Sequence, residues 1–425
     1  MATLCDNDGM DIYLVGGAVR DRLLGLAPRE RDWVVVDGDA EDLLARGFRR
    51  VGRDFPVFLH PQSGEEYALA RRERKTAPGY HGFSFDTDRS VTLAEDLARR
   101  DLTINAMAMT EAGELVDPHG GRADLEARRL RHVSPAFVED PVRILRVARF
   151  RARLGELGFE IADETMALMR RMVDDGEADA LVAERVWQET SRALEEPEPH
   201  AYFQVLRDCG ALARVFPEID ALYGVPQPAR WHPEIDTGVH TLMVLEQAAR
   251  LSPSGEVRFA ALTHDLGKAA TPPELWPSHR GHEAHSVRLV DALCDRLRVP
   301  NRYRELAIHA ARHHGHVHRA MELRPATMLR VIRDVGGLRR PEKLDAFLLA
   351  CEADARGRTG MEDDPYPQAE RFRRAADVAR AVDIAPLRER GYEGAALGKA
   401  IEQAQVRAIT AALATLDAGE DTDYA

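Results

Sequence analysis

The hydrophobic pattern of the chain changes near Glu139. Before this residue, short apolar segments of strand character alternate with helical ones, whereas helical periodicity dominates after it. Strands are predicted at residues 12–15, 33–36, 56–59 and 66–70, with a short helix at 39–46 and a hairpin over 106–116. Helices are predicted after the change at residues 140–154, 163–174, 183–194, 199–208, 240–251, 257–266, 285–297 and 302–313. The sequence therefore predicts an α+β fold, in which a small mixed sheet with a few helices precedes an all-α remainder.

Breaks rich in proline and glycine divide the 425 residues further. One break lies around Gly224 and Pro226, and a second runs from Gly336 to Pro341. Length alone suggests about three domains. Together with the change of pattern, the breaks predict four parts, with boundaries at 1–138, 139–225, 226–338 and 339–425.

Composition argues against two classes of protein. The chain contains no apolar run of about 18 residues or more, so we expect no membrane span. Cys5, Cys209, Cys294 and Cys351 have no paired spacing. Scattered cysteines favour reduced thiols in the cytoplasm over a disulfide framework or a zinc ribbon.

A Gly-Gly turn and two carboxylates form the first candidate site. Gly16-Gly17 follows the first predicted strand, and Glu30 and Asp32 stand at the start of the second. Alternate residues of a strand share a face, so the two carboxylates would project side by side. Carboxylates beside a turn with open backbone N–H groups suit a Mg²⁺-bound nucleotide, although two solvated charges at a strand start are the alternative. Glu66, on a neighbouring strand, is the candidate third carboxylate.

Asp140 and Arg143 stand at the start of the first helix of the all-α part. Asp140 can cap this helix, with Pro141 in its first turn. The pair can also recognise a base, because a carboxylate accepts from the amino group of cytosine or adenine while a guanidinium donates to the adjacent ring nitrogen. Uracil and guanine carry a carbonyl in place of that amino group, so the same pair would reject them. Three residues apart on one helix, the two side chains could form a protein template.

A basic segment crosses this region, although the chain has a net charge of −13. From Arg122 to Arg153, nine arginines stand against four acidic residues. Arg146, Arg149 and Arg153 continue from Arg143 as an oblique stripe on the predicted helix. Such a stripe can bind the phosphates of a nucleotide or a polyanion. The alternative is an exposed basic face without a ligand.

Histidine and aspartate residues indicate a second site in the helical part. His264-Asp265 follows an apolar helix, His240 stands 24 residues earlier, and Asp354 lies far downstream. Neutral imidazoles and a carboxylate form a donor set for a divalent transition metal. Further histidines could supply ligands, bind phosphate or simply lie at the surface, namely His279, His282, His285, His309, His313, His314, His316 and His318.

Four motifs occur in a definite order along the chain: GGAVRD at 16–21, RDW at 31–33, RRDLTINA at 99–106 and EDPVR at 139–143. With them the chain resembles the class II tRNA nucleotidyltransferases, the bacterial CCA-adding enzymes, over essentially its whole length. Its His-Asp part resembles the HD phosphohydrolase domain of one subgroup. One departure concerns the first metal position, which is commonly Asp in that family and is Glu30 here. Glutamate can still bind Mg²⁺, but its carboxylate reaches one methylene further.

The resemblance implies a nucleotidyltransferase palm, a helical neck and body, an HD domain and a helical tail for the four predicted parts. It implies template-free addition and repair of the 3′-terminal CCA of tRNA by two-metal nucleotidyl transfer. CTP, ATP and the tRNA acceptor end are the expected partners of a monomer or dimer. Mg²⁺ would bind Glu30 and Asp32, with Glu66 as a further catalytic carboxylate.

The resemblance also implies two sets of binding residues. Residues expected to bind the nucleotide, or phosphates of the tRNA, are Gly17, Arg20, Arg100, Asp140, Arg143, Arg146 and Arg149. Residues expected to bind a divalent transition metal, with Ni²⁺ as a candidate, are His240, His264, Asp265 and Asp354. The implied HD activity is that of a metal-dependent phosphatase and 2′,3′-cyclic phosphodiesterase.

Three alternatives stay open at this stage. A poly(A) polymerase shares the palm motifs, but the HD domain and the acidic C-terminal segment speak against it. HD hydrolysis could be the main activity. A non-enzymatic RNA-binding module would leave the glycine turn and the carboxylate spacing unexplained.

Overall fold

The computed structural model describes residues 10–28, 30–51, 57–75, 83–86 and 88–420. Their contacts form two compact units. The first unit comprises Met1–Glu189 and Val205–Val215, and the second comprises Thr190–Gln204 and Phe216–Ala425. The predicted α+β class is confirmed, whereas the four predicted domain boundaries stay a prediction.

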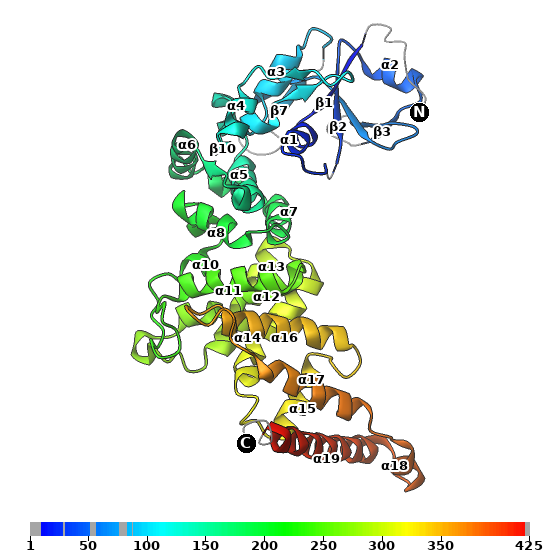
Figure 1. Ribbon diagram of the computed structural model, residues 1–425, viewed down its shortest axis with the longest axis vertical. Coiled ribbons are helices and arrows are strands. Elements are labelled where there is room, and N and C mark those ends of the chain that lie inside the picture. The colour runs from blue at the N-terminus through cyan, green and yellow to red at the C-terminus, as the bar shows by residue number, and fades with distance from the viewer. Residues whose placement is uncertain (1–9, 29, 52–56, 76–82, 87, 421–425) are drawn as a thin grey trace. The chain divides into compact units, whose positions relative to one another are not determined.

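A mixed sheet forms the centre of the first unit (Figure 1). Its strands, in spatial order, are β3 (Arg49–Val51), β4 (Val57–Leu59), β5 (Glu66–Leu69), β2 (Asp32–Val36), β1 (Asp11–Val15), β8 (Ala108–Met109) and β9 (Leu115–Val116). Strand β1 is antiparallel to β2 and β8, whereas β2 and β5 run parallel. Two further strand pairs are β6 (Arg72–Lys75) with β7 (Phe83–Asp86), and β10 (Arg129–Leu130) with β11 (Glu160–Ile161).

Helices accompany the sheet and then replace it. Those of the sheet region are α1 (Gly17–Leu23), α2 (Ala40–Ala45), α3 (Leu93–Ala98) and α4 (Gly121–Glu126). They are followed by α5 (Val142–Leu154), α6 (Asp163–Asp174), α7 (Ala183–Leu194), α8 (Pro199–Asp208) and α9 (Ala211–Val215). Local sequence explains α3, because Thr92 and Glu95 form a reciprocal capping box at its first turn.

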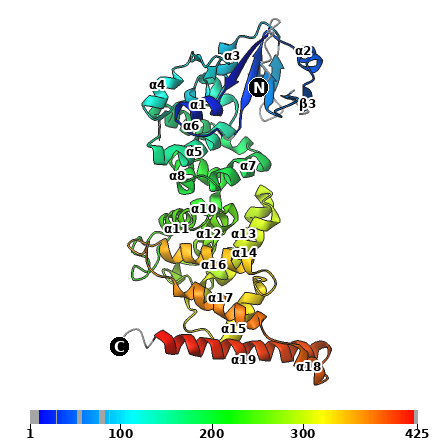
Figure 2. The same cartoon turned by 45° about the vertical axis from the view of Figure 1, so that its right-hand side comes forward.

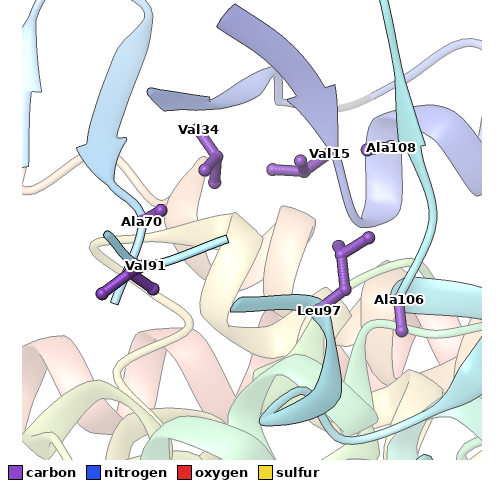
Figure 3. Packing of buried hydrophobic residues seen from close by; sticks show 7 residues of the cluster. All are labelled: Val15, Val34, Ala70, Val91, Leu97, Ala106 and Ala108. Carbon is purple, nitrogen blue, oxygen red and sulfur yellow. The ribbon is translucent and has the colours of Figure 1, made fainter. Parts of the chain in front are cut away.

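A compact apolar cluster fixes one face of the sheet. Figure 3 shows its buried side chains, which are Val15, Val34, Ala70, Val91, Leu97, Ala106 and Ala108. Leu97 comes from α3, whereas Val15 and Val34 come from β1 and β2. A shift of β2 by one residue would turn Val34 away from this core, so the cluster also sets the face on which Asp32 lies.

The regular elements in the described residues of the second unit are helices, joined by turns and loops (Figure 2). Its helices are α10 (Pro217–Asp220), α11 (Thr237–Leu251), α12 (Gly255–Thr263), α13 (His282–Leu297), α14 (Asn301–His318), α15 (Pro325–Asp334), α16 (Pro341–Arg356), α17 (Pro367–Arg380), α18 (Ala385–Glu389) and α19 (Gly394–Glu420). Val244, Ala248, Ala261 and Ala353 form a core cluster that joins α11, α12 and α16. None of the described helices is both long enough and apolar enough to span a bilayer.

Most predicted elements lie within a few residues of their observed bounds, and the exceptions concern the sites. Residue 56, predicted as a strand start, lies outside the described residues. Helix α5 starts at Val142, so Asp140 precedes the helix and has an extended backbone. Helix α12 ends at Thr263, and the chain turns at His264-Asp265 into a 3-10 helix over Leu266–Ala270. Within this 3-10 helix, any side chain at Gly267 would collide with the His282 carbonyl. Helix α14 continues past residue 313 to His318, which brings two more histidines to the second site.

Candidate active site and metal centre

The Gly-Gly turn holds an arginine against the backbone. Gly16 caps α1 with a φ of +68°, a conformation that favours glycine. A Cβ at Gly16 would lie 2.9 Å from Nη1 of Arg100. Arg100 Nη2 donates to Asp96 at 3.3 Å, which helps to fix the guanidinium beside the turn. Arg100 can therefore lie this close to the turn because Gly16 has no side chain.

Three predicted carboxylates gather near this turn. Asp32 is the first residue of β2, and its register partner on β5 is Glu66, so the two side chains project from the same face. The expectation that Glu30 belongs to the strand is wrong, because β2 begins only at Asp32. Glu30 nevertheless lies close enough to influence the charge of Asp32. All three residues are exposed to solvent.

The electrostatics of Asp32 fit a cation site. Desolvation by the surrounding protein raises the pKa of Asp32, and the charge of Glu30 raises it further, while Arg100 acts in the opposite direction. A divalent cation would relieve both effects that disfavour the carboxylate. Hard carboxylate oxygens of this kind are the ligands that Mg²⁺ prefers. The donor set thus fits a divalent metal.

Arg20 is buried beneath the turn. Its Nε and Nη2 donate to Oδ1 of Asp21 at 2.9 and 2.7 Å, and its Nη1 donates to Asn105 at 2.6 Å. Asn105 in turn donates to Asp101 at 3.0 Å. The Arg20 side chain is only 1% exposed. This network connects α1 to the RRDLTINA segment and supports the turn from below.

The predicted basic stripe is neutralised by carboxylates within the same unit. Arg146 Nε donates to Asp101 at 2.7 Å, and Arg153 Nη2 donates to Asp21 at 2.8 Å. Desolvation alone would raise the pKa of Asp101, but Arg146 holds it well below its usual range. An exposed, unpaired basic face is therefore the wrong description of this stripe.

Arg149 is the most enclosed member of the stripe. Its Nε donates to Glu189 at 2.7 Å, and its guanidinium lies 4.8 Å from the centre of the Phe150 ring. The side chain is buried. Contact with a phosphate stays a prediction for Arg146 and Arg149, and either contact would compete with the carboxylates that now hold them.

In the described part of the chain, the side chains of Asp140 and Arg143 bind other groups and not each other. Arg143 donates Nη1 to the carbonyl of Ala136 at 2.7 Å and Nη2 to that of Arg99 at 2.6 Å. Asp140 accepts from the Val142 N–H at 3.1 Å, but the prediction that it caps α5 is wrong, because Pro141 occupies the N-cap position and, among the described residues, no side chain caps this helix end. The arrangement ties both residues to the junction between the sheet region and α5.

Sequence analysis missed the strongest partner of Asp140. Arg185 on α7 donates Nη1 to Oδ1 at 3.0 Å and Nη2 to Oδ2 at 2.8 Å. The charge of Arg185 gave no signal of this role, because 45 residues separate it from Asp140. Only the packing of α7 brings the two together.

The four predicted metal ligands of the second unit meet in one buried centre. His240 Nε2 lies 3.1 Å from Asp354 Oδ1, and His264 Nε2 lies 3.2 Å from Asp265 Oδ2. His264 Nε2 is also 3.5 Å from Asp354 Oδ2. His240 and Asp354 come from α11 and α16, whose packing sets their separation.

Further residues complete this centre. His282 and His314 approach Asp265 Oδ1 at 3.0 and 3.5 Å, whereas His318 approaches Asp354 Oδ2 at 2.6 Å. These histidines belonged to the unassigned group in the sequence. A spacing of four residues on one helix is the signal that places His314 and His318 on a common face.

Backbone carbonyls orient the imidazoles for metal binding. The Nδ1 atom of each ring lies near a carbonyl oxygen: 3.0 Å for His240, 2.6 Å for His264, 3.0 Å for His282 and 2.9 Å for His314. A carbonyl only accepts, so Nδ1 carries a proton in each ring, and Nε2 is the nitrogen that faces the centre. Carbonyls that accept from the outer ring nitrogen impose this orientation on metal-binding histidines. The residues therefore fit a divalent metal.

The charges of the centre attract a cation. Desolvation disfavours the protonated form of His264, but Asp265 and Asp354 raise its pKa to about 10. Burial lowers the pKa of His314 to about 3, so this ring is neutral at pH 7. A metal would take the place of the proton on His264 as the partner of the two carboxylates.

Three stretches of the chain match known protein families. The family described as Poly A polymerase head domain matches residues 12–131. The family described as Probable RNA and SrmB-binding site of polymerase A matches residues 158–223, and the HD domain family matches residues 237–359.

Relatives match over nearly the whole chain. The Multifunctional CCA protein of Thioalkalivibrio sulfidiphilus is 65% identical over 400 residues, which cover 94% of this chain and 98% of the relative. The protein of that name from Methylococcus capsulatus is 64% identical over 401 residues, which cover 94% of each chain. A solved structure of a CCA-adding enzyme with CTP matches with a TM-score of 0.64 and 22% identity, covering 94% of this chain and 87% of that one. At this identity the structural match shows a common fold.

Proposed function

The chain belongs to the family of multifunctional CCA proteins, and we propose that it completes and repairs the 3′-terminal CCA of tRNA from CTP and ATP without a nucleic-acid template. The observation that carries this proposal is that Asp32 and Glu66 are register partners on neighbouring strands. They lie near the turn where Arg100 approaches Gly16. A solved structure similar in fold contains a CCA-adding enzyme from Thermotoga maritima with tRNA.

The proposed reaction forms a bond between the tRNA 3′-oxygen and the α-phosphorus of the nucleotide, and it breaks the bond from that phosphorus to pyrophosphate. Asp32, Glu30 and Glu66 would hold Mg²⁺, which neutralises charge on the phosphates when bound. Arg100, fixed beside Gly16, is positioned to contact the triphosphate. Arg20 keeps the turn itself in place through Asp21 and Asn105, which leaves the backbone N–H of Gly17 in the role of a phosphate donor.

Base choice is assigned to Asp140 and Arg143. The carboxylate would accept from the amino group of cytosine or adenine, and Arg143 would donate to the adjacent ring nitrogen. Arg143 donates to two carbonyls, so this role requires its guanidinium to exchange partners. Arg146 and Arg149 are proposed to contact phosphates of the nucleotide or of the tRNA acceptor end.

Incubation with tRNA that lacks its 3′-terminal CCA, with one NTP at a time, tests this function. We expect CMP incorporation from CTP alone, AMP incorporation once the two cytidines are in place, and none from UTP or GTP. A long adenylate tract made from ATP alone would instead identify a poly(A) polymerase. No incorporation from any NTP would refute nucleotidyl transfer.

We also propose hydrolysis of phosphate esters at the histidine centre, with 2′,3′-cyclic phosphodiesters and phosphomonoesters as substrates and Ni²⁺ as the preferred metal. The support is the inward orientation of four Nε2 atoms around Asp265 and Asp354. Removal of metal with a chelator should abolish release of product from 2′,3′-cyclic AMP, and added Ni²⁺ should restore it. Unchanged hydrolysis in the chelator would refute the proposal, and restoration by Mg²⁺ alone would refute the choice of metal.

A cytoplasmic location is proposed as well. Among the described residues, Cys209, Cys294 and Cys351 are free and buried. Buried thiols of this kind are typical of proteins in a reducing compartment. Whether the chain is a monomer or a dimer stays a prediction that sedimentation would decide.

A further inference from the structure

Both oxygens of the Asp140 carboxylate are engaged by one guanidinium. Arg185 Nη1 lies 3.0 Å from Oδ1, and Arg185 Nη2 lies 2.8 Å from Oδ2. Two parallel N–H···O bonds of this kind are directional as well as strong, so they fix the plane of the carboxylate. The two side chains are 27% and 22% exposed, which leaves the pair accessible from solvent.

A second charge on the same helix strengthens this connection. Glu189 follows Arg185 by four residues on α7, so the two side chains lie on one face. Glu189 accepts from Arg149 at 2.7 Å and lies 3.9 Å from Arg146. On one face of α7, Arg185 therefore pairs with Asp140, and Glu189 contacts two arginines of α5. These contacts define how α7 packs on the start of α5.

The hydrogen bonds leave little of the Asp140 carboxylate unused. An ionised carboxylate has about four acceptor positions. Two on Oδ1 receive Arg185 and the Val142 N–H, and one on Oδ2 receives Arg185. Counting only hydrogen bonds from the described residues, one position is left, on Oδ2, and it can accept from a single amino group. The carbonyl of uracil or guanine offers no hydrogen at that point and would be repelled.

We propose that Arg185 determines base specificity by fixing the Asp140 carboxylate so that one acceptor position on Oδ2 faces the incoming base. This inference rests on the proposed function, because it assumes that Asp140 reads the base. Arg185 is a positioning residue, since it acts through Asp140 and is not required to touch the nucleotide. Without Arg185, the carboxylate can rotate and accept from other donors. The preference for cytosine and adenine over uracil and guanine is then lost.

Equilibrium binding of CTP, ATP and UTP to the full chain, measured by calorimetry, tests the inference alongside single-nucleotide incorporation. Arg185→Ala should reduce the preference for CTP over UTP by at least about tenfold, the range expected for loss of one bidentate contact. Arg185→Lys keeps the charge but offers no planar fork, so it should give an intermediate loss. Arg214→Ala is the matched control, because Arg214 pairs with Asp179 elsewhere in the same unit and should leave the ratio unchanged.

The outcomes separate this inference from the proposed function. If the unmodified chain adds CMP and AMP while both Arg185 variants keep its CTP:UTP ratio, the positioning role is refuted and the function stands. If the unmodified chain incorporates no nucleotide, the function fails first. If Arg185→Ala does not fold, Arg185→Lys decides. A uniform fall in affinity for all three nucleotides would contradict the inference, because it would indicate a structural role only.

Discussion

The two candidate sites hold their carboxylates in opposite ways. Asp32 and Glu66 lie exposed at the ends of neighbouring strands, and desolvation together with Glu30 raises the pKa of Asp32. Asp265 and Asp354 are buried among imidazoles. Desolvation opposes their ionisation, but His264 and its neighbours hold the pKa of both carboxyls well below the usual range.

This difference indicates how each site obtains its metal. The buried centre brings together nitrogen and oxygen donors from the protein, and the ligand atoms of His240, His264 and Asp265 lie within 4.8 Å of one another. The strand-end carboxylates supply only part of a coordination shell, and Mg²⁺ commonly completes such a shell with water and substrate phosphates. We therefore expect the histidine centre to retain its metal through dialysis and the first site to bind Mg²⁺ mainly together with a nucleotide.

The largest expected effect is on nucleotidyl transfer. Asp32→Ala removes the carboxylate at the centre of the first site and should reduce CMP incorporation by about a thousandfold, since loss of metal stabilisation costs several kcal/mol. Single-turnover incorporation into tRNA lacking CCA measures this. Hydrolysis of 2′,3′-cyclic AMP should be unaffected, and so should incorporation by Asp11→Asn, which changes an exposed carboxylate at the far end of the paired strand. Near-normal incorporation by Asp32→Ala would contradict the assignment.

At the histidine centre, we expect a substitution to lower hydrolysis and to leave nucleotidyl transfer unchanged. His264→Ala should lower hydrolysis by at least about a hundredfold, because loss of a direct ligand exceeds the effect of losing a supporting residue. CMP incorporation should stay intact. His285→Ala serves as the control, because His285 is a half-buried residue of the same helix whose Nδ1 accepts from Arg288. Metal content and hydrolysis both equal to those of the unmodified chain would show that His264 is no ligand.

The opposite pKa shifts predict opposite effects on stability in metal-free protein. Asp354 has a lowered pKa in the folded state, so its ionised form stabilises the fold above its ordinary pKa, and this stability is lost as the pH falls. Asp354→Asn should therefore destabilise the second unit at pH 7, by roughly 3 kcal/mol for a broken buried pair. Hydrogen exchange of α11 and α16 at pH 7 measures this loss.

Asp32 should behave in the opposite sense. Its pKa is raised in the folded state, so ionisation costs stability above its ordinary pKa, and the cost disappears as the pH falls below that value. Asp32→Asn should stabilise the sheet region at pH 7 by less than about 1 kcal/mol, since the residue is exposed and screened by solvent. Slower hydrogen exchange in β1 and β2 is the expected result. Destabilisation by this variant would contradict the electrostatic contrast between the sites.

A substitution in the glycine turn should have a smaller effect than those at the two sites. Gly16→Ala should cost about 1–2 kcal/mol of stability from the left-handed backbone alone and should also displace Arg100 from its place beside the turn. We expect a higher KM for CTP in addition to the loss of stability. Gly25→Ala is the matched control, because Gly25 has a φ of +72° but no atom within 4 Å of an added Cβ. Equal KM values for the two variants would mean that Arg100 does not depend on Gly16.

The sequence was most informative where local pattern determines the structure. The apolar run after Asp32 fixed the strand and its buried face, and the motif order indicated which family the chain resembles. It was less informative where distant segments meet. Nothing in the sequence paired Arg185 with Asp140, and Glu30 lies before the strand, because strand ends depend on pairing with β1 and β5.

At the histidine centre, too, only some of the residues could be predicted from the sequence. His240, His264, Asp265 and Asp354 could be selected from residue type and order, and the structure brings them together. The roles of His282 and His314 depend on how α13 and α14 pack against the segment around Asp265 and Gly267. That packing is a tertiary property, so periodicity alone could not separate these rings from surface histidines.

Sequencing of tRNA 3′ ends after extension with all four NTPs present tests the central claim most directly. The substrate is tRNA that ends before CCA, and the enzyme is the full chain with Mg²⁺. The account predicts that cytidine, cytidine and adenosine are added in that order and that extension then stops. Incorporation of uridine or guanosine, or an adenylate tract that continues past the first adenosine, would contradict it.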